Sequence, residues 1–190
     1  IAGLVTGSAG ASTASVGDGF VLERKLVDLD LVAGGTAELA DAVMLEFSLS
    51  DFSLAVGTAG FGLAIGGSSL KIVSVAPAVA DGRSWLAIAG SGLSVTLSAG
   101  SLLSASVTNL ELEINRATLP ATALDWTTQV EVGDTDDVFA ATPGQLLVAY
   151  TADKLRVAGD LANLNIAGLV TGSAGASTAS VGDGFVLERK

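Results

Sequence analysis

The sequence predicts an all-β protein, built either as an elongated β-solenoid or as a long antiparallel β-meander. Apolar residues alternate with small or charged residues through most of the chain, which is the period of a strand with one buried face. Turn signals that contain glycine recur about every 8–12 residues in the middle of the chain, a spacing typical of all-β proteins. Parallel rungs and antiparallel hairpins both require one apolar face per strand, so this pattern leaves the topology open.

The alternation predicts a series of short strands with turns between them. In chain order, the strands are expected at residues 27–31, 43–49, 52–56, 61–65, 93–97, 110–114 and 155–157. Pairs such as Gly34-Gly35, Gly66-Gly67, Asp81-Gly82 and Pro143-Gly144 supply the turns. Residues 36–47 have a competing interpretation, because Leu39, Val43 and Phe47 also follow the i, i+4 spacing of a helix. We therefore expect at most one short helix.

The chain contains an internal repeat. Residues 1–25, IAGLVTGSAGASTASVGDGFVLERK, recur without a change as residues 166–190. Such identity indicates copying, since many different sequences would satisfy the same pair of strands. We expect residues 1–165 to be one complete unit of a tandem array and residues 166–190 to be the start of the next copy. Two alternatives are an overlap left when one unit was cut from an array, and an engineered chain that closes on itself.

Further copies of the chain are the partner that this arrangement predicts, because units in an array complete their cores against their neighbours. The apolar residues of the repeated segment are the expected self-association surface. They are Ile1, Leu4, Phe20 and Leu22 in the first copy and Ile166, Leu169, Phe185 and Leu187 in the second. Residues 1–165 alone would then expose an apolar edge and associate.

Two stretches carry a resemblance to a known class of protein. They are GLSVTLSAGSLLSASVTNLELEINRA (residues 92–117) and LLVAYTADKLRVAGDLANLNIAGLVTGSAGASTA (residues 146–179). Their texture of strand, glycine turn and strand, with small outward residues, resembles the repeats of giant adhesin-like proteins that bacteria secrete or display. The resemblance implies an extracellular or cell-surface, extended, multi-copy structural protein. It transfers no functional residue, and the calcium-binding nonapeptide of many such proteins is absent.

Composition excludes several functions. The chain has no cysteine and no histidine, so disulfides, thiolate metal sites and histidine-dependent catalytic triads are ruled out. A net charge of −11 repels phosphate backbones, so we expect no nucleic-acid partner. The uncharged residues 86–110 alternate with period two and are rich in hydroxyls and glycine, so we expect no transmembrane helix.

One acidic loop is a candidate cation site. Asp134, Asp136 and Asp137 lie close together in the sequence, and carboxylate oxygens are the ligands that Ca²⁺ prefers. The loop lacks the glycine and the distal glutamate of an EF-hand, and a solvated acidic turn is the better explanation. Calcium is thus a possible ligand, and no other cofactor is expected.

Pairs of carboxylates also occur on the strands. Glu111 and Glu113 share one strand face, as do Asp28 and Asp30, and such pairs can hydrolyse glycosides. Ion pairs with Arg116, Lys71 or Arg156 on neighbouring strands are the better explanation. We therefore expect no enzyme.

The function that the sequence predicts is a structural repeat module of a long extracellular fibre, stalk or surface assembly. The alternative is an adhesion module that binds glycan, a cell surface or calcium. That alternative requires Trp85, Trp126 or Tyr150 to be exposed near acidic loops.

Overall fold

The computed structural model describes residues 5–9, 19–32, 37–58, 60–133, 139, 146–175 and 184–189. Within these ranges the chain forms strands and no helix, which confirms the all-β prediction. The strands are β1 (Val5–Ser8), β2 (Phe20–Leu29), β3 (Leu39–Thr58), β4 (Phe61–Ala76), β5 (Trp85–Ala99), β6 (Leu103–Ala117), β7 (Val130–Val132), β8 (Lys154–Ile166), β9 (Val170–Ala174) and β10 (Phe185–Glu188). In the described part of the chain, no helix is long and apolar enough to cross a membrane.

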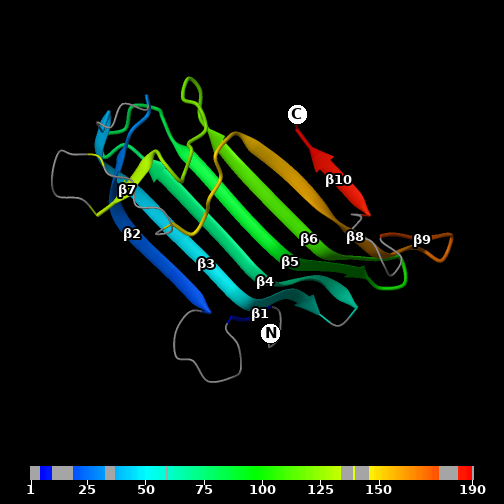
Figure 1. Cartoon of the computed structure of the whole chain (residues 1–190). Helices are drawn as coiled ribbons and strands as arrows, with labels where there is room; N and C mark the ends of the chain where they lie inside the picture. The colour runs from blue at the N-terminus through cyan, green and yellow to red at the C-terminus, as the bar shows by residue number, and fades with distance from the viewer. Residues whose placement is uncertain are drawn as a thin grey trace.

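All ten strands belong to one antiparallel sheet (Figure 1). Its order is β10-β8-β6-β5-β4-β3-β2-β7, and β1 pairs with β3 while β9 pairs with β8. Strands β3 to β6 follow one another as consecutive hairpins, so the sheet is an open meander. Every pairing is antiparallel, so of the two predicted topologies the described strands form the meander and not the parallel rungs of a solenoid.

The helical interpretation of residues 36–47 is wrong from Leu39 onward, because these residues open strand β3. A spacing of four residues keeps Leu39, Val43 and Phe47 on one face of a strand as well as of a helix. Pairing on both sides selects the strand: Val43 lies opposite Leu26 of β2 and Ala76 of β4.

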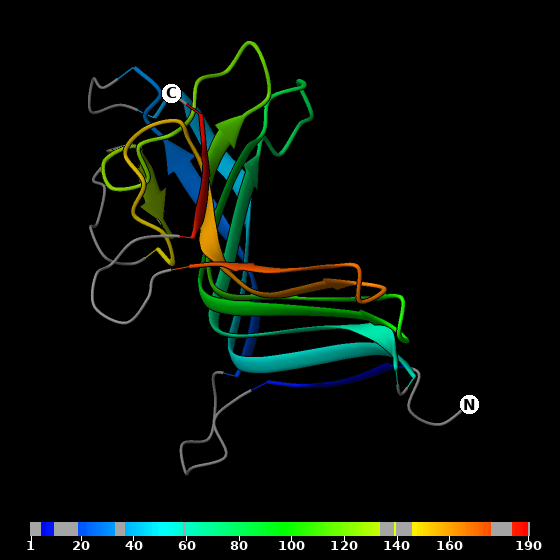
Figure 2. The same ribbon diagram turned by 90° about the vertical axis from the view of Figure 1, so that its right-hand side faces the viewer.

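The long strands turn through a sharp corner near their middles, so the sheet has two arms (Figure 2). Residues with a positive φ lie mid-strand: Asp51 (45°) in β3, Gly92 (58°) in β5 and Asn109 (51°) in β6. Glycine, aspartate and asparagine tolerate this conformation best. The pairing of β5 with β6, and of β6 with β8, shifts register beside Gly92 and Asn109, as β-bulges do.

One arm carries the hydrophobic core. This covered arm comprises residues 20–29, 39–50, 69–76, 85–90, 111–117 and 154–159, and the described parts of residues 118–153 lie over one of its faces (Figure 2). The buried cluster between them consists of Val27, Leu29, Ala42, Met44, Val73, Val75, Trp85, Ala87, Leu124, Trp126, Val130 and Val148. Among the described residues, no member of this cluster belongs to the repeated segment.

In the part of the chain that the structure describes, the other arm is a single layer of sheet. This open arm comprises residues 52–58, 61–67, 93–99, 103–108 and 160–166, with β1 and β9 along its edges. Apolar residues such as Leu54, Ile65 and Val95 oppose one another along one face. The residues of the other face are small: Ser53, Ala55, Gly57, Gly62, Ala64, Gly66, Ser94, Thr96, Ser98, Ser104 and Ser106.

Asn115 fastens the covering segment to the sheet. Its side chain is fully buried and its Nδ2 donates to the carbonyl oxygens of Leu124 (2.8 Å) and Ala152 (2.7 Å). Its Oδ1 accepts a hydrogen bond from Nε1 of Trp126 at 2.8 Å. One β6 side chain thus satisfies two polar groups that the core would otherwise leave unpaired, and it also bonds the carbonyl of the exposed Ala152.

We predict that Asn115→Ala lowers the free energy of unfolding by roughly 2–4 kcal/mol, because it leaves two buried polar groups, the Leu124 carbonyl and the Trp126 ring N–H, without partners. Urea unfolding measures this change. Asn163→Ala is the matched control, because Asn163 is exposed and bonds only the Ser104 hydroxyl (3.1 Å) in the described structure. An Asn115→Ala protein as stable as this control would contradict the assigned role.

Candidate interface between repeats

The two copies of the repeated segment form the two opposite edges of the sheet. In the first copy, β1 and β2 both pair with β3. In the second copy, β9 and β10 both pair with β8. Strand β9 begins at Val170, the copy of Val5, and β10 begins at Phe185, the copy of Phe20. The same sequence therefore forms two successive strands twice. In the first copy both strands pair with β3, and in the second copy both pair with β8.

Strand β2 directs alternate backbone groups to its two sides, as every strand of an antiparallel sheet does. The N–H of Ser50 donates to the carbonyl of Gly19 (3.0 Å), which lies directly opposite it in the β2–β3 register. The backbone N–H and C=O groups of Gly19, Val21 and Glu23 thus point toward β3. Those of the residues between them point away from β3. On that far side, the carbonyl of Leu26 accepts from Gly133 N at 3.3 Å, which confirms the alternation.

The backbone groups of Phe20, Leu22 and Arg24 therefore point out of the sheet edge. Strand β7 occupies the same edge only at Val27–Leu29, beyond the repeated segment. Within the described residues, no strand pairs with the outer side of residues 20–24. This part of the edge can accept another strand.

Strand β10 uses the opposite set of backbone groups. The N–H of Arg189 donates to the carbonyl of Leu155 at 3.1 Å, and these residues are opposite each other in the β10–β8 register. By the same alternation, the backbone N–H and C=O groups of Phe185, Leu187 and Arg189 point toward β8. They are the copies of Phe20, Leu22 and Arg24, whose backbone groups are unused by β3. One strand with this sequence can therefore pair with β8 on one side and with β3 on the other.

The side chains of the two copies also face the same way. Lys25 lies opposite the buried Met44, which places Val21, Glu23 and Lys25 on the core face of the sheet. In the second copy, Val186 and Glu188 lie opposite Ala158 and Arg156. These β8 residues share the face of Asn115 and hence of the core. A strand that joined the two edges would keep the core face continuous.

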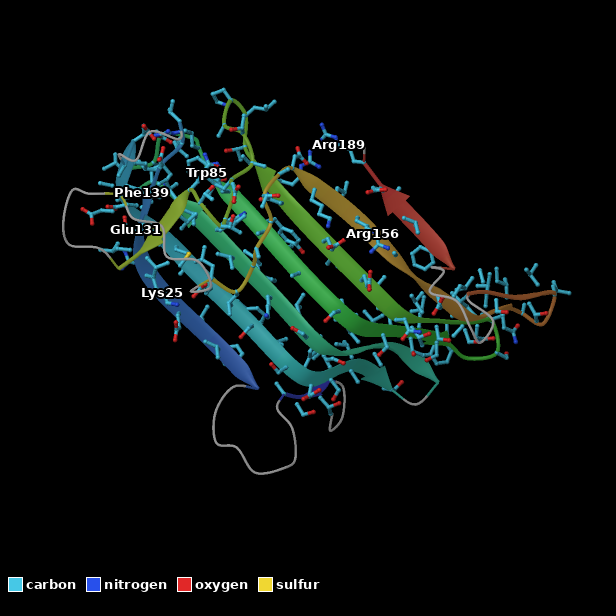
Figure 3. The ribbon with its side chains drawn as sticks, viewed as in Figure 1. Lys25, Trp85, Glu131, Phe139, Arg156 and Arg189 are labelled. Carbon is cyan, nitrogen blue, oxygen red and sulfur yellow. The ribbon has the colours of Figure 1, made fainter. Side chains whose placement is uncertain are left out.

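Charged residues follow this face at both edges (Figure 3). At the β2 edge, Lys25 forms ion pairs with the buried Glu46 and with Glu23 (2.9 Å). Burial lowers the pKa of Lys25, but the hydrogen bonds to Glu46 and Glu23 outweigh it and hold that pKa above its ordinary value.

At the β8 edge, Arg156 forms ion pairs with Glu111 and with Glu113 (3.6 Å). Lys154 contacts Glu113 at 2.8 Å. The predicted explanation of this carboxylate pair by ion pairing is therefore confirmed for Arg156. Arg116 instead lies 4.0 Å from Asp153.

The predicted self-association residues lie at the two edges rather than together. Phe20 and Leu22 are 59% and 60% exposed on the β2 edge, and the ring of Phe20 meets that of Phe47 edge to face at 5.6 Å. Phe185 and Leu187 belong to β10, and Ile166 is the last residue of β8. Leu169 is 88% exposed in the turn before β9. Ile1 and Leu4 fall outside the described residues.

Side-chain hydrophobicity alone does not predict which strand these edges can pair with. The informative property is which backbone groups face outward, and that depends on the register of β2 and β10 with their neighbours. The identity of the two copies was the only sequence signal that pointed to these edges.

The predicted calcium loop cannot be placed, because Asp134, Asp136 and Asp137 lie outside the described residues. Among the residues that are described, no group of three or more acidic residues is arranged to hold a metal ion.

The aromatic residues do not form the exposed cluster that glycan binding would require. Trp85 and Trp126 are 1% and 2% exposed, and both belong to the core. Their ring N–H groups are satisfied inside the fold, by the Thr122 carbonyl (2.9 Å) and by Asn115. Tyr150 lines a cavity of about 340 Å³ beside Lys71, Glu111 and Glu113, and its hydroxyl donates to Ile88 O at 3.1 Å.

Comparisons with protein-family models, with curated proteins and with solved structures give no match for this chain.

We predict that Tyr150 titrates far above an ordinary tyrosine. Burial, and secondarily the negative charge of Glu113, raises its pKa from 10.0 to about 12. Since the folded state holds this proton more tightly, the stability contributed by the group is complete below pH 10 and is lost as the pH rises toward about 12. Tyr150 is the only tyrosine, so tyrosinate absorbance measures it directly.

Glu113→Gln provides the control for this titration. Removal of the negative charge should lower the midpoint while leaving most of the effect of burial. A midpoint near 10 in the unaltered folded protein would contradict the half-buried position of the ring beside Glu113.

Proposed function

We propose that the chain is a structural repeat module of a long fibre, stalk or surface assembly on the outside of a bacterial cell. Residues 1–165 are one unit of a tandem array, and residues 166–190 are the first strands of the next unit. Each unit joins the next through continuous β structure, and the function is mechanical. In this role the chain catalyses no reaction.

One observation carries this proposal: the two copies of the repeated segment direct complementary backbone groups toward different neighbours. In the first copy, residues 19, 21 and 23 face β3, while in the second copy Phe185, Leu187 and Arg189 face β8. A single copy placed between two units would satisfy both neighbours at once. An unpaired sheet edge is ordinarily a liability, and neighbouring copies remove it here.

Composition supports the extracellular and structural parts of the proposal. The chain contains no cysteine or histidine and has a net charge of −11, and small residues fill one face of the open arm. The resemblance to giant bacterial adhesin-like repeats points the same way. Burial of Trp85 and Trp126 removes the main support for the glycan-binding alternative.

We predict that residues 1–165 associate end to end into rods while the full chain stays monomeric at the same concentration. Loss of residues 166–190 uncovers the β8 edge, which then accepts β2 of another molecule. In the full chain, β10 already covers this edge. Every member of the buried cluster lies between Val27 and Val148, so the shortened chain retains its core. Sedimentation velocity and negative-stain micrographs measure the outcome.

Leu22→Pro in the shortened chain tests the backbone contact itself. It removes an N–H that faces away from β3, and proline is tolerated on edge strands, so association should be lost without loss of the fold. Leu22→Ala retains that N–H and should still associate. Shortened chains that stay monomeric and as heat-stable as the full chain would refute the proposal.

A further inference from the structure

We infer that successive copies form one continuous cross-β ribbon with six strands per repeat and an offset of two residues at every seam. At the contact between two copies, the outer edge of β8 in one copy pairs with residues 20–24 of β2 in the next copy. The inference rests on the proposed tandem arrangement and specifies its geometry.

The offset follows from the strand registers of the covered arm. A row of directly opposed residues begins at Val21 and crosses the sheet through Ser48, Lys71, Ala89, Glu113 and Arg156 to Glu188. Glu188 is the copy of Glu23. The row thus re-enters the repeated segment two residues beyond the position at which it left.

The open arm gives the same offset independently. Its row begins at Gly7 and passes through Leu54, Ile65, Val95, Val107 and Leu161 to Ala174. Ala174 is the copy of Ala9, again two residues further along. The two arms lie on either side of the corner and pair through different strands of the repeated segment, β9 and β10. Their agreement shows that both parts of the segment can dock on the same neighbour at once.

An even offset is a requirement for a continuous sheet. Because side chains alternate between the two faces, a shift of one residue would turn every apolar side chain of the next copy to the opposite face. A shift of two residues preserves both the core face and the direction of the backbone hydrogen bonds. The duplicated segment meets both conditions.

Strand β7 leaves room for this contact. It pairs with Val27–Leu29 of β2, and Gly133 N bonds Leu26 O. In the β10–β8 register, Leu155 lies opposite Arg189, the copy of Arg24. On the β2 edge of the next copy, β8 of the preceding copy would therefore pair only as far as the point where β7 of that next copy begins.

The strand count sets the length of the repeat. Each row crosses one strand of the repeated segment and then β3, β4, β5, β6 and β8 before it reaches the next copy. With strands about 4.8 Å apart, six strands advance the ribbon by about 29 Å per repeat. The strands lie across the fibre axis, displaced by roughly 7 Å along their own direction in each repeat.

Engineered cross-links in a longer chain test this geometry. The chain extends the full sequence after Lys190 with a further copy of residues 26–190, and it has no native cysteine to interfere. Ala158→Cys with Val186→Cys should form a disulfide on the β8 side of the junction strand. Arg189→Cys with Leu45→Cys of the added copy should form one on the β3 side, since Arg24 lies opposite Leu45. Both pairs are non-hydrogen-bonded, where Cα atoms lie closest.

Two slipped pairs are the controls. Val186→Cys with Arg156→Cys, and Arg189→Cys with Phe47→Cys of the added copy, are each displaced by two residues and should not cross-link. Peptide mapping without reduction identifies the links. Fibre diffraction of chains with several copies should show a meridional spacing of about 4.8 Å and a repeat of about 29 Å.

The outcomes separate this inference from the proposed function. Both in-register links together with the 29 Å repeat support the ribbon. Rods with a different repeat, or with links only in the slipped pairs, overturn the ribbon and leave the fibre proposal intact. Flexible beads without a link to the added copy overturn both.

Discussion

The alternation of backbone hydrogen bonding along a strand is the constraint on which this account depends. Each residue of an antiparallel strand directs its N–H and C=O to one neighbour, and the next residue directs them to the other. In the first copy of the repeated segment, β3 uses Gly19 and therefore the odd-numbered residues. In the second copy, β8 uses Arg189 and therefore the copies of the even-numbered residues. No strand could join two such neighbours if both copies used the same set.

The rest of the structure keeps these edges in place. Asn115 and the buried tryptophans anchor the covering segment over one arm, which fixes the middle of the sheet. Asp51, Gly92 and Asn109 set the corner between the arms. No described residue of the repeated segment belongs to the buried cluster, and its described strands form the edges of the sheet.

Much of the fold followed from the sequence. Period-two alternation located parts of the long strands, and Asp81-Gly82 lies in the connection between β4 and β5 as predicted. The turn predicted at Gly66-Gly67 is wrong, because these residues lie inside β4, and Gly34-Gly35 and Pro143-Gly144 fall outside the described residues. The helical pattern of Leu39, Val43 and Phe47 misled because a spacing of four fits both periods, and only pairing with β2 and β4 decides between them. The sequence could not decide the topology, because parallel rungs and antiparallel hairpins both require one apolar face per strand. The edges were signalled only by the duplication of residues 1–25, and their polarity required the registers of β2 and β10.

Amide hydrogen exchange in the full chain, resolved by residue, tests the central claim most directly. Hydrogen-bonded amides exchange more slowly than those that face solvent. In the first copy, Val21 and Glu23 should exchange slowly and Leu22 and Arg24 quickly. In the second copy the pattern should invert, with Leu187 and Arg189 slow and Val186 and Glu188 fast. Protection of the same set of amides in both copies would contradict the account.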